Sequence, residues 1–236
     1  MYRCETTSIE GFIQQLAVSY VGQGYWFYVS GRVPARKDPR AVDAKLMARY
    51  GVDISKWARA RRKVGGLANV HYIRHERFWV LLASKGVHRF FRDEPNFKDI
   101  RQKPLKFEGY SISYKHGADG KWHPSIRLHP DRYRELKAYF VDLATHRTAE
   151  RLWLEFEALQ IVPYAPVRRQ LLDILRAVNR VRHDAGFDRL PSSVLRLRKW
   201  VIRPFADSRN RLRHNALVPV STMCKAERSV ADQPRR

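Results

Sequence analysis

The sequence has few of the residues that would build a disulfide framework, a zinc site or a membrane span. Its two cysteines, Cys4 and Cys224, lie near opposite ends, which argues against disulfides and against a cysteine-based zinc site. No apolar run approaches the roughly 18 residues that a spanning helix needs. The start, MYRCETTSIEGF, lacks the charged beginning and apolar middle of a signal peptide. We therefore expect a soluble, cytoplasmic protein that does not associate with membranes.

Motifs for the common chemistries are also missing. None of the nine histidines forms a His-x-His pair, which a rolling-circle or single-strand transposase fold would need to hold its metal. The early glycines, Gly22, Gly24 and Gly31, do not have the spacing of a phosphate-binding loop. There is no Gly-x-Ser-x-Gly or His-Glu-x-x-His motif. We expect no cofactor and no metal.

Negative charge is scarce as well. The 236 residues include 46 Lys and Arg against 23 Asp and Glu, so the formal net charge is +23. Such an excess repels itself in a compact state, and the simplest reason to keep it is a polyanionic partner. Nucleic acid is the leading candidate, and an anionic membrane surface is the second. Because 44% of the residues are hydrophobic, the chain can still build a core.

The periodicity of the apolar residues predicts an α+β chain. A mixed antiparallel sheet, with a helix-turn-helix-like helix pair and a hairpin, should occupy residues 1–128, an all-helical domain 129–206 and a flexible basic tail 207–236. Helices are expected from a Thr7/Glu10 capping box to about Tyr20, then over 39–50, 54–63, 130–147, 148–160, 166–186 and 192–202. Strands are expected over 25–33, 69–74, 77–84, 105–117 and 121–129, with residues 87–104 as a loop.

The segment AKLMARYGVDISKWARARRK is typical of a helix, a tight turn at Gly51 and a second helix. The spacing of Leu46, Tyr50, Val52 and Trp57 predicts a seam shared by the two helices. The segment resembles a helix-turn-helix unit, which implies that the second helix enters the major groove. Its cations, and those of the following hairpin tip as a wing, are the candidate nucleic-acid contacts: Lys56, Arg59, Arg61, Arg62, Lys63, Arg74, His75 and Arg77.

Two alternatives remain open for this region. The helices could instead pack on one face of a sheet, with their charges simply solvated. The aromatic residues of the strand-like segments could stack on unpaired bases or lie in the core; they are Trp26, Tyr28, Tyr72 and Trp79.

A second basic surface is predicted in the helical part. Val167, Leu171, Ile174, Val178 and Val181 recur at intervals of four and three, which indicates an apolar stripe. The cations on other faces could form a phosphate track or a solvated face, and they are Arg168, Arg169, Arg176, Arg180, Arg182, Arg196, Arg198, Lys199 and Arg203.

These patterns predict a nucleic-acid-binding protein, for DNA or structured RNA, within a larger mobile-element, replication or antiviral-defence complex. One alternative is a metal-independent endonuclease that processes RNA, with an acid, a base and a cation drawn from residues such as His71, Tyr72, His75 and Lys115. Another is a ribonucleoprotein scaffold whose helical part docks a protein partner. Tyr133 and Lys137 have the spacing of a tyrosine nucleophile with a neighbouring cation, but the histidine pair of such enzymes is missing.

Overall fold

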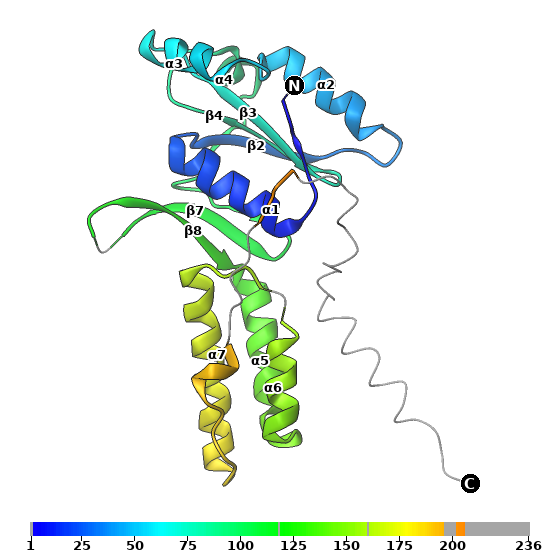
Figure 1. The fold of residues 1–236 in the computed structure, drawn as a ribbon, viewed down its shortest axis with the longest axis vertical. Coiled ribbons are helices and arrows are strands. Elements are labelled where there is room, and N and C mark those ends of the chain that lie inside the picture. Colours follow the sequence, from blue (N-terminus) through cyan, green and yellow to red (C-terminus); the bar gives the residue numbers. More distant parts are fainter. Residues whose placement is uncertain (1, 118, 160, 196–201, 206–236) are drawn as a thin grey trace. The chain divides into compact units, whose positions relative to one another are not determined.

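The computed structural model describes residues 2–117, 119–159, 161–195 and 202–205. They divide into two compact units, one reaching to His129 together with residues 202–205, the other beginning at Pro130 (Figure 1). The predicted α+β class is confirmed, with sheets and helices in the first unit and helices in the second. The predicted basic tail, 207–236, lies outside the described residues.

The strands of the first unit form two sheets. Five strands follow the order β1-β3-β4-β2-β5, in which only the β1–β3 pair is parallel, and three form the antiparallel sheet β6-β7-β8. The strands are β1 (Glu5–Thr6), β2 (Phe27–Arg32), β3 (Val70–His75), β4 (Phe78–Ala83), β5 (Lys98–Asp99), β6 (Leu105–Phe107), β7 (Tyr110–His116) and β8 (Trp122–Leu128).

Four α-helices and two short helical turns complete the first unit. They are α1 (Ile9–Gln14), the π-helical η1 (Gln15–Tyr20), the 3-10 turn η2 (Val21–Gln23), α2 (Pro39–Tyr50), α3 (Lys56–Val64) and α4 (Arg89–Asp93). The last lies where the sequence predicted only a loop. The cap of α1 is Ser8, whose Oγ accepts from the Gly11 amide at 3.0 Å, so the predicted capping box was one residue early.

Helix α2 begins and ends where its local signals placed it. The Asp38 carboxylate accepts hydrogen bonds from the amides of Arg40 and Ala41, and Pro39 occupies the first helical position. Gly51 ends the helix with φ of +59°, a conformation that glycine adopts without the steric cost of a Cβ atom.

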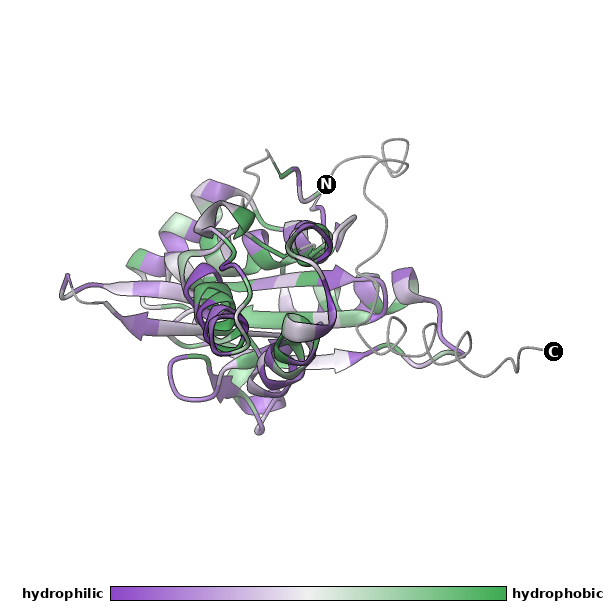
Figure 2. Ribbon diagram, turned by 90° about the horizontal axis from the view of Figure 1, so that it is seen from below, coloured by the Kyte–Doolittle hydropathy of each residue, from purple (hydrophilic) through white to green (hydrophobic). Residues whose placement is uncertain are grey.

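The five-stranded sheet has apolar cores on both faces. Figure 2 shows hydrophobic residues in green in both the strands and the helices. On one face, Tyr50 from α2 and Phe90 from α4 pack on Tyr72 and Leu81 of the strands. On the other, Phe12 of α1 contacts residues of both sheets, with its ring centroid 4.2 Å from that of Phe107 and 5.9 Å from that of Phe78. Successive β3 residues therefore face different surroundings, because side chains alternate along a strand.

The second unit consists of the helices α5 (Pro130–His146), α6 (Ala149–Glu157) and α7 (Ala165–Asp184) and the 3-10 turn η3 (Ser192–Leu195). The predicted stripe of α7 is buried, except that Val181 is only partly covered. Phe140 of α5 and Phe156 of α6 stack with centroids 4.0 Å apart. Among the described residues, no helix combines the length and the apolarity that crossing a bilayer requires.

Candidate nucleic-acid interface

Helix α3 is attached to the sheet by arginine side chains rather than by apolar packing. None of its residues is buried. Arg59 donates from Nη1 to the Val70 carbonyl at 2.9 Å and from Nη2 to the Val52 carbonyl. Arg62 donates from Nη2 to the Ala68 carbonyl at 3.0 Å. These two arginines, three residues apart, form the inward side of the helix.

The structure therefore changes the role assigned to Arg59 and Arg62. Both were candidate phosphate contacts, yet their guanidinium groups satisfy main-chain carbonyls at the edge of the sheet. The Asn69 side chain adds a bond in the opposite direction, from Nδ2 to the Arg59 carbonyl at 2.9 Å. A guanidinium occupied in this way fixes the helix and contributes little to an external ligand.

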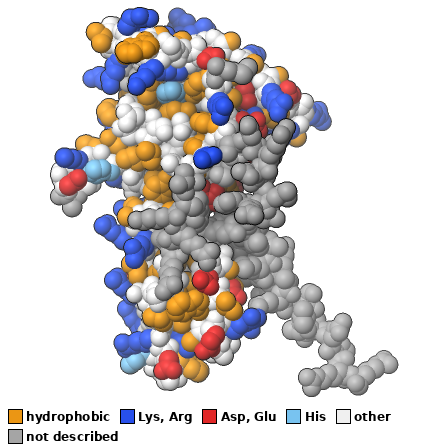
Figure 3. All heavy atoms as spheres, in the orientation of Figure 1, with side chains coloured by type: hydrophobic (Ala, Val, Ile, Leu, Met, Phe, Trp, Pro, Cys, Tyr) orange, Lys and Arg blue, Asp and Glu red, His pale blue; other side chains and the backbone are white. Residues whose placement is uncertain are grey.

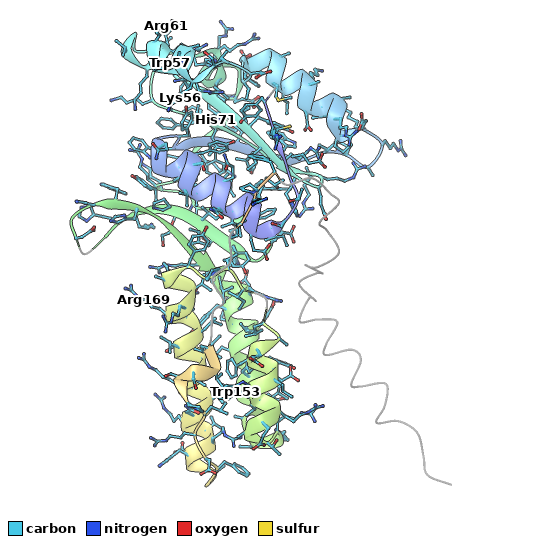
Figure 4. The ribbon with its side chains drawn as sticks, viewed as in Figure 1. Lys56, Trp57, Arg61, His71, Trp153 and Arg169 are labelled. Carbon is cyan, nitrogen blue, oxygen red and sulfur yellow. The ribbon has the colours of Figure 1, made fainter. Side chains whose placement is uncertain are left out.

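The outward side of α3 carries free cations. The side chains of Lys56, Arg61 and Lys63 are exposed and form no hydrogen bond or ion pair with any described residue. Ser55 caps the helix, its Oγ accepting from the Ala58 amide at 3.1 Å. Figure 4 labels Lys56, Trp57 and Arg61 on this helix.

Two large apolar side chains lie between these cations. Trp57 is 78% exposed and Val64, seven residues later, is 91% exposed. The predicted seam was wrong for Trp57, since Tyr50, Val52 and the partly buried Leu46 pack on the sheet without it. The cations of this surface were predicted from the sequence, but its apolar part was not, because the apolar spacing placed Trp57 in a buried seam.

The apolar part continues beyond the helix. Leu67 and Val87, which pair through an isolated parallel bridge, are 42% and 74% exposed. Gly86 makes this close approach possible, because a Cβ atom there would lie 2.6 Å from the main chain of Gly66 and Ala68. We call the resulting surface the α3 face, and it comprises Lys56, Trp57, Arg61, Lys63, Val64, Leu67 and Val87. Figure 3 shows hydrophobic and basic side chains side by side at this end of the first unit.

The predicted wing residue Arg74 is buried. It is 2% exposed, and its guanidinium forms an ion pair with Asp43 of α2, with Nε 2.8 Å from Oδ1 and Nη2 2.9 Å from Oδ2. The Tyr72 hydroxyl donates to the same carboxylate at 2.6 Å. This network fastens α2 to the sheet, so Arg74 serves the fold and is not part of the α3 face.

The other two wing candidates also have internal partners. His75 lies with Nδ1 3.2 Å from the Thr6 carbonyl. Arg77 donates to the carbonyl oxygens of Pro34 at 2.6 Å and Ala35 at 3.0 Å, which closes the loop before α2. Both half-buried side chains therefore make contacts within the first unit.

The residues considered for metal-free RNA cleavage are not brought together. His71 and Tyr72 are neighbours in β3 and face opposite sides of the sheet. His71 stacks on Tyr20 with centroids 4.2 Å apart, and its Nδ1 lies 3.0 Å from the Tyr2 hydroxyl. Burial, aided by the positive charge of Arg59, lowers the pKa of His71 to about 3. Its imidazole is therefore neutral at physiological pH and enclosed by tyrosines.

The predicted cations of α7 divide into two groups. Arg182 is 3% exposed and donates to the carbonyls of Ala144 and Asp188, so it is structural. Four others are exposed and form no hydrogen bond or ion pair through their side chains with the described residues: Arg168, Arg169, Arg176 and Arg180. Figure 4 labels Arg169 among them. Arg196, Arg198 and Lys199 lie outside the described residues.

Tyr133 and Lys137 form a link between two helices. The Tyr133 hydroxyl donates to Asp173 of α7, and Lys137 Nζ lies 3.0 Å from the same carboxylate. Burial, together with the hydrogen bond to the Asp173 carboxylate, raises the pKa of Tyr133. Among the described residues, no cluster of three or more His, Cys, Asp or Glu side chains is arranged to hold a metal ion.

Comparisons with known proteins add no family assignment: no family model, curated protein or solved structure matches the chain.

Proposed function

We propose that this chain is a nucleic-acid-binding protein that docks the α3 face on DNA or structured RNA. We further propose that it acts within a larger complex, of the kind that mobile elements, replication or antiviral defence employ. The proposal rests on the observation that the cations of α3 have two different roles. Two inward arginines hold the helix, and three outward cations flank an exposed tryptophan.

The chemistry of the α3 face suits a phosphodiester backbone. Each Lys or Arg that neutralises a phosphate releases a condensed counterion, which favours binding at low salt. The planar Arg61 guanidinium can engage a phosphate or a guanine edge through two parallel hydrogen bonds. Trp57 offers a flat apolar surface for a base or sugar, and base stacking on an aromatic contributes about 1–3 kcal/mol.

The alternative, in which the charges of α3 are simply solvated, does not explain why apolar residues of this helix are exposed. A surface helix of a globular protein normally turns its apolar side chains toward the core. In α3 the inward positions are arginines and the apolar residues face outward, although burial of a side chain such as Val64 would stabilise the fold by about 1.5–3 kcal/mol. A partner that covers Trp57, Val64, Leu67 and Val87 would remove their apolar surface from water, and this burial would favour binding.

The test removes the outward charge and leaves the inward arginines in place. The triple variant Lys56→Gln/Arg61→Gln/Lys63→Gln should bind a duplex or hairpin RNA of about 20 base pairs more weakly than wild type. If each side chain contacts one phosphate, the slope of log K against log salt falls by about 2.7. Fluorescence anisotropy over about 50 to 200 mM salt measures both quantities.

The matched control removes the same charge elsewhere in the first unit. Arg36, Arg40 and Lys45 are also exposed, so their replacement by Gln lowers the net charge equally. Equal affinities of the two triple variants would contradict the α3 assignment. Vesicles containing anionic lipid provide the second comparison, because preferential binding to them over nucleic acid would identify a membrane surface as the partner.

A further inference from the structure

The β7–β8 hairpin has one apolar face that begins in the core and ends in solvent. Residues of this face pair across the strands in the order Tyr110 with Leu128, Ile112 with Ile126, Tyr114 with Pro124 and His116 with Trp122. The first two pairs are buried, whereas Tyr114 is partly exposed and Trp122 is 48% exposed. The turn of this hairpin projects beyond the other elements of the first unit (Figure 1).

The outer part of this face continues as a row of planar side chains. Trp122 stacks on Tyr114 with centroids 5.7 Å apart and planes 21° from parallel. The ring centroid of Trp26 lies 5.8 Å from that of Tyr114, and the Arg101 guanidinium carbon lies over the Trp26 ring, 4.3 Å from its centroid. The Asp99 carboxylate fixes that guanidinium through bonds of 3.0 Å to Nε and 2.6 Å to Nη2.

The row has a fixed end and an open end. Arg101 and Asp99 close one end, while the His116 ring contacts Trp122 edge-on at 5.7 Å, which leaves Trp122 half-exposed at the other end. Trp122 is therefore the large ring of the row that keeps about half of its surface in solvent. The open ring is therefore available to one more planar group.

The charge around the open end favours an anion. The side chains of Lys115 and Lys121 are exposed and form no hydrogen bond or ion pair with the described residues. They alternate with Tyr114, His116 and Trp122, so they lie on the other face of the hairpin, next to its turn. The only carboxylate in the hairpin sequence, Asp119, is engaged by His123, with Oδ2 2.8 Å from Nε2. A planar ligand that carries negative charge matches both features, and a nucleotide base with its phosphate is such a ligand.

We propose that the outer face of the β7–β8 hairpin binds unpaired bases of a single-stranded nucleic acid. A base stacks on Trp122 and extends the row of Tyr114, Trp26 and Arg101, while Lys115 and Lys121 give the turn end of the hairpin a positive charge that attracts the phosphate chain. The inference rests on the proposed nucleic-acid function and adds to it a second site, distinct from the α3 face, with its own form of ligand. A proline-rich peptide would also suit an aromatic row, but the flanking lysines favour the nucleic acid.

The test separates bases from phosphates. Wild-type protein is titrated with labelled oligothymidylate and with an abasic strand of the same length and charge. Stacking predicts roughly 5- to 150-fold tighter binding of the base-bearing strand, which corresponds to the ~1–3 kcal/mol of one stacked base. Trp122→Ala should remove most of this preference, and Trp122→Phe should keep part of it. Phe187→Ala is the control, because Phe187 is an aromatic residue of similar exposure, 47%, that belongs to neither proposed site, and it should leave the preference intact.

Failure of this site is distinguishable from failure of the α3 face. Equal affinity of wild type for the two strands, or a preference that survives in Trp122→Ala, would overturn the hairpin site and leave the duplex measurements on α3 untouched. If Trp122→Ala folds poorly, an NMR measurement on the wild-type protein tests the hairpin site instead. Its Trp122 indole NMR signal, assigned by comparison with Trp122→Phe, should shift with oligothymidylate and not with the abasic strand or a proline-rich peptide.

Discussion

Helices α3 and α7 are both rich in arginine, but they are attached to the protein in opposite ways. The attachment of α7 is apolar, and its exposed arginines lie on the side away from a buried stripe of Val167, Leu171, Ile174 and Val178. The attachment of α3 is polar, through Arg59 and Arg62, and its large apolar residues face solvent. The comparison teaches that a charged face alone does not mark a functional site. What distinguishes α3 is that its charge accompanies apolar surface that the fold leaves uncovered.

The largest expected effect is a loss of stability when a buried apolar residue of α7 is shortened. Leu171 is 1% exposed, so Leu171→Ala should destabilise the second unit by about 2–5 kcal/mol, since it removes buried methyl groups and leaves a cavity. Trp57→Ala, although it deletes a larger side chain, should change stability by no more than about 0.5 kcal/mol. Urea denaturation followed by circular dichroism measures both changes. A comparable loss in Trp57→Ala would show that this ring packs against the protein in solution.

The next effect tests the polar attachment of α3. Arg59→Met removes a charged donor from two main-chain carbonyls, and a hydrogen bond to a charged group contributes about 1.5–3 kcal/mol. We expect amide hydrogen exchange in α3 to accelerate well before the sheet exchanges. Arg61→Met, two residues later with no described partner, is the matched control and should leave exchange unchanged. Equal protection in the two variants would mean that something other than Arg59 holds α3.

Arg59 also lowers the pKa of the buried His71, so the stability of the protein should depend on pH. The pKa of His71 is lowered to about 3 in the folded protein, from an ordinary 6.5, first by burial and then by the charge of Arg59. Between these values the unfolded chain binds more protons than the folded one. The contribution of His71 to stability is therefore complete above pH 6.5 and is lost as the pH falls toward 3.

Denaturation midpoints collected from neutral to acid pH measure this effect. His71→Phe keeps a ring between Tyr20 and Tyr25 and should flatten the acid limb of the profile. Arg59→Met should raise the pKa of His71 in NMR titrations, because it removes the second cause of the shift. An unchanged acid limb in His71→Phe would show that another group governs the loss of stability.

Much of the fold follows from short-range signals in the sequence. The bounds of α2 could be predicted because their signals are local. Asp38 caps its first amides, Pro39 takes the first helical position, and Gly51 ends the helix. The stripe of α7 could be predicted because its apolar spacing matches the helical repeat. Signals of this kind act within a few residues, so they can be recognised in the sequence without knowledge of the tertiary structure.

The roles of the arginines could not be read in this way. Arg74 is buried because Asp43, 31 residues earlier, lies opposite it once α2 packs on the sheet. Arg59 faces inward because the carbonyls of Val52 and Val70 come together only in the folded unit. The exposure of Trp57 follows from that orientation. The row of rings on the β7–β8 hairpin similarly depends on strand register, which sets Trp122 opposite His116.

The smallest expected effect concerns the exposed arginines of α7. Arg169, Arg176 and Arg180 span twelve residues of helix, a track of about 16 Å. Replacing all three with Gln removes as much charge as the α3 triple variant does. We expect a weaker loss of duplex affinity, because no exposed apolar surface of α7 accompanies these charges as it does in α3, and an unchanged preference for base-bearing over abasic strands. If the α7 variant instead loses more affinity than the α3 variant, the principal contact lies on the second unit, and the exposed tryptophan of α3 requires a different partner.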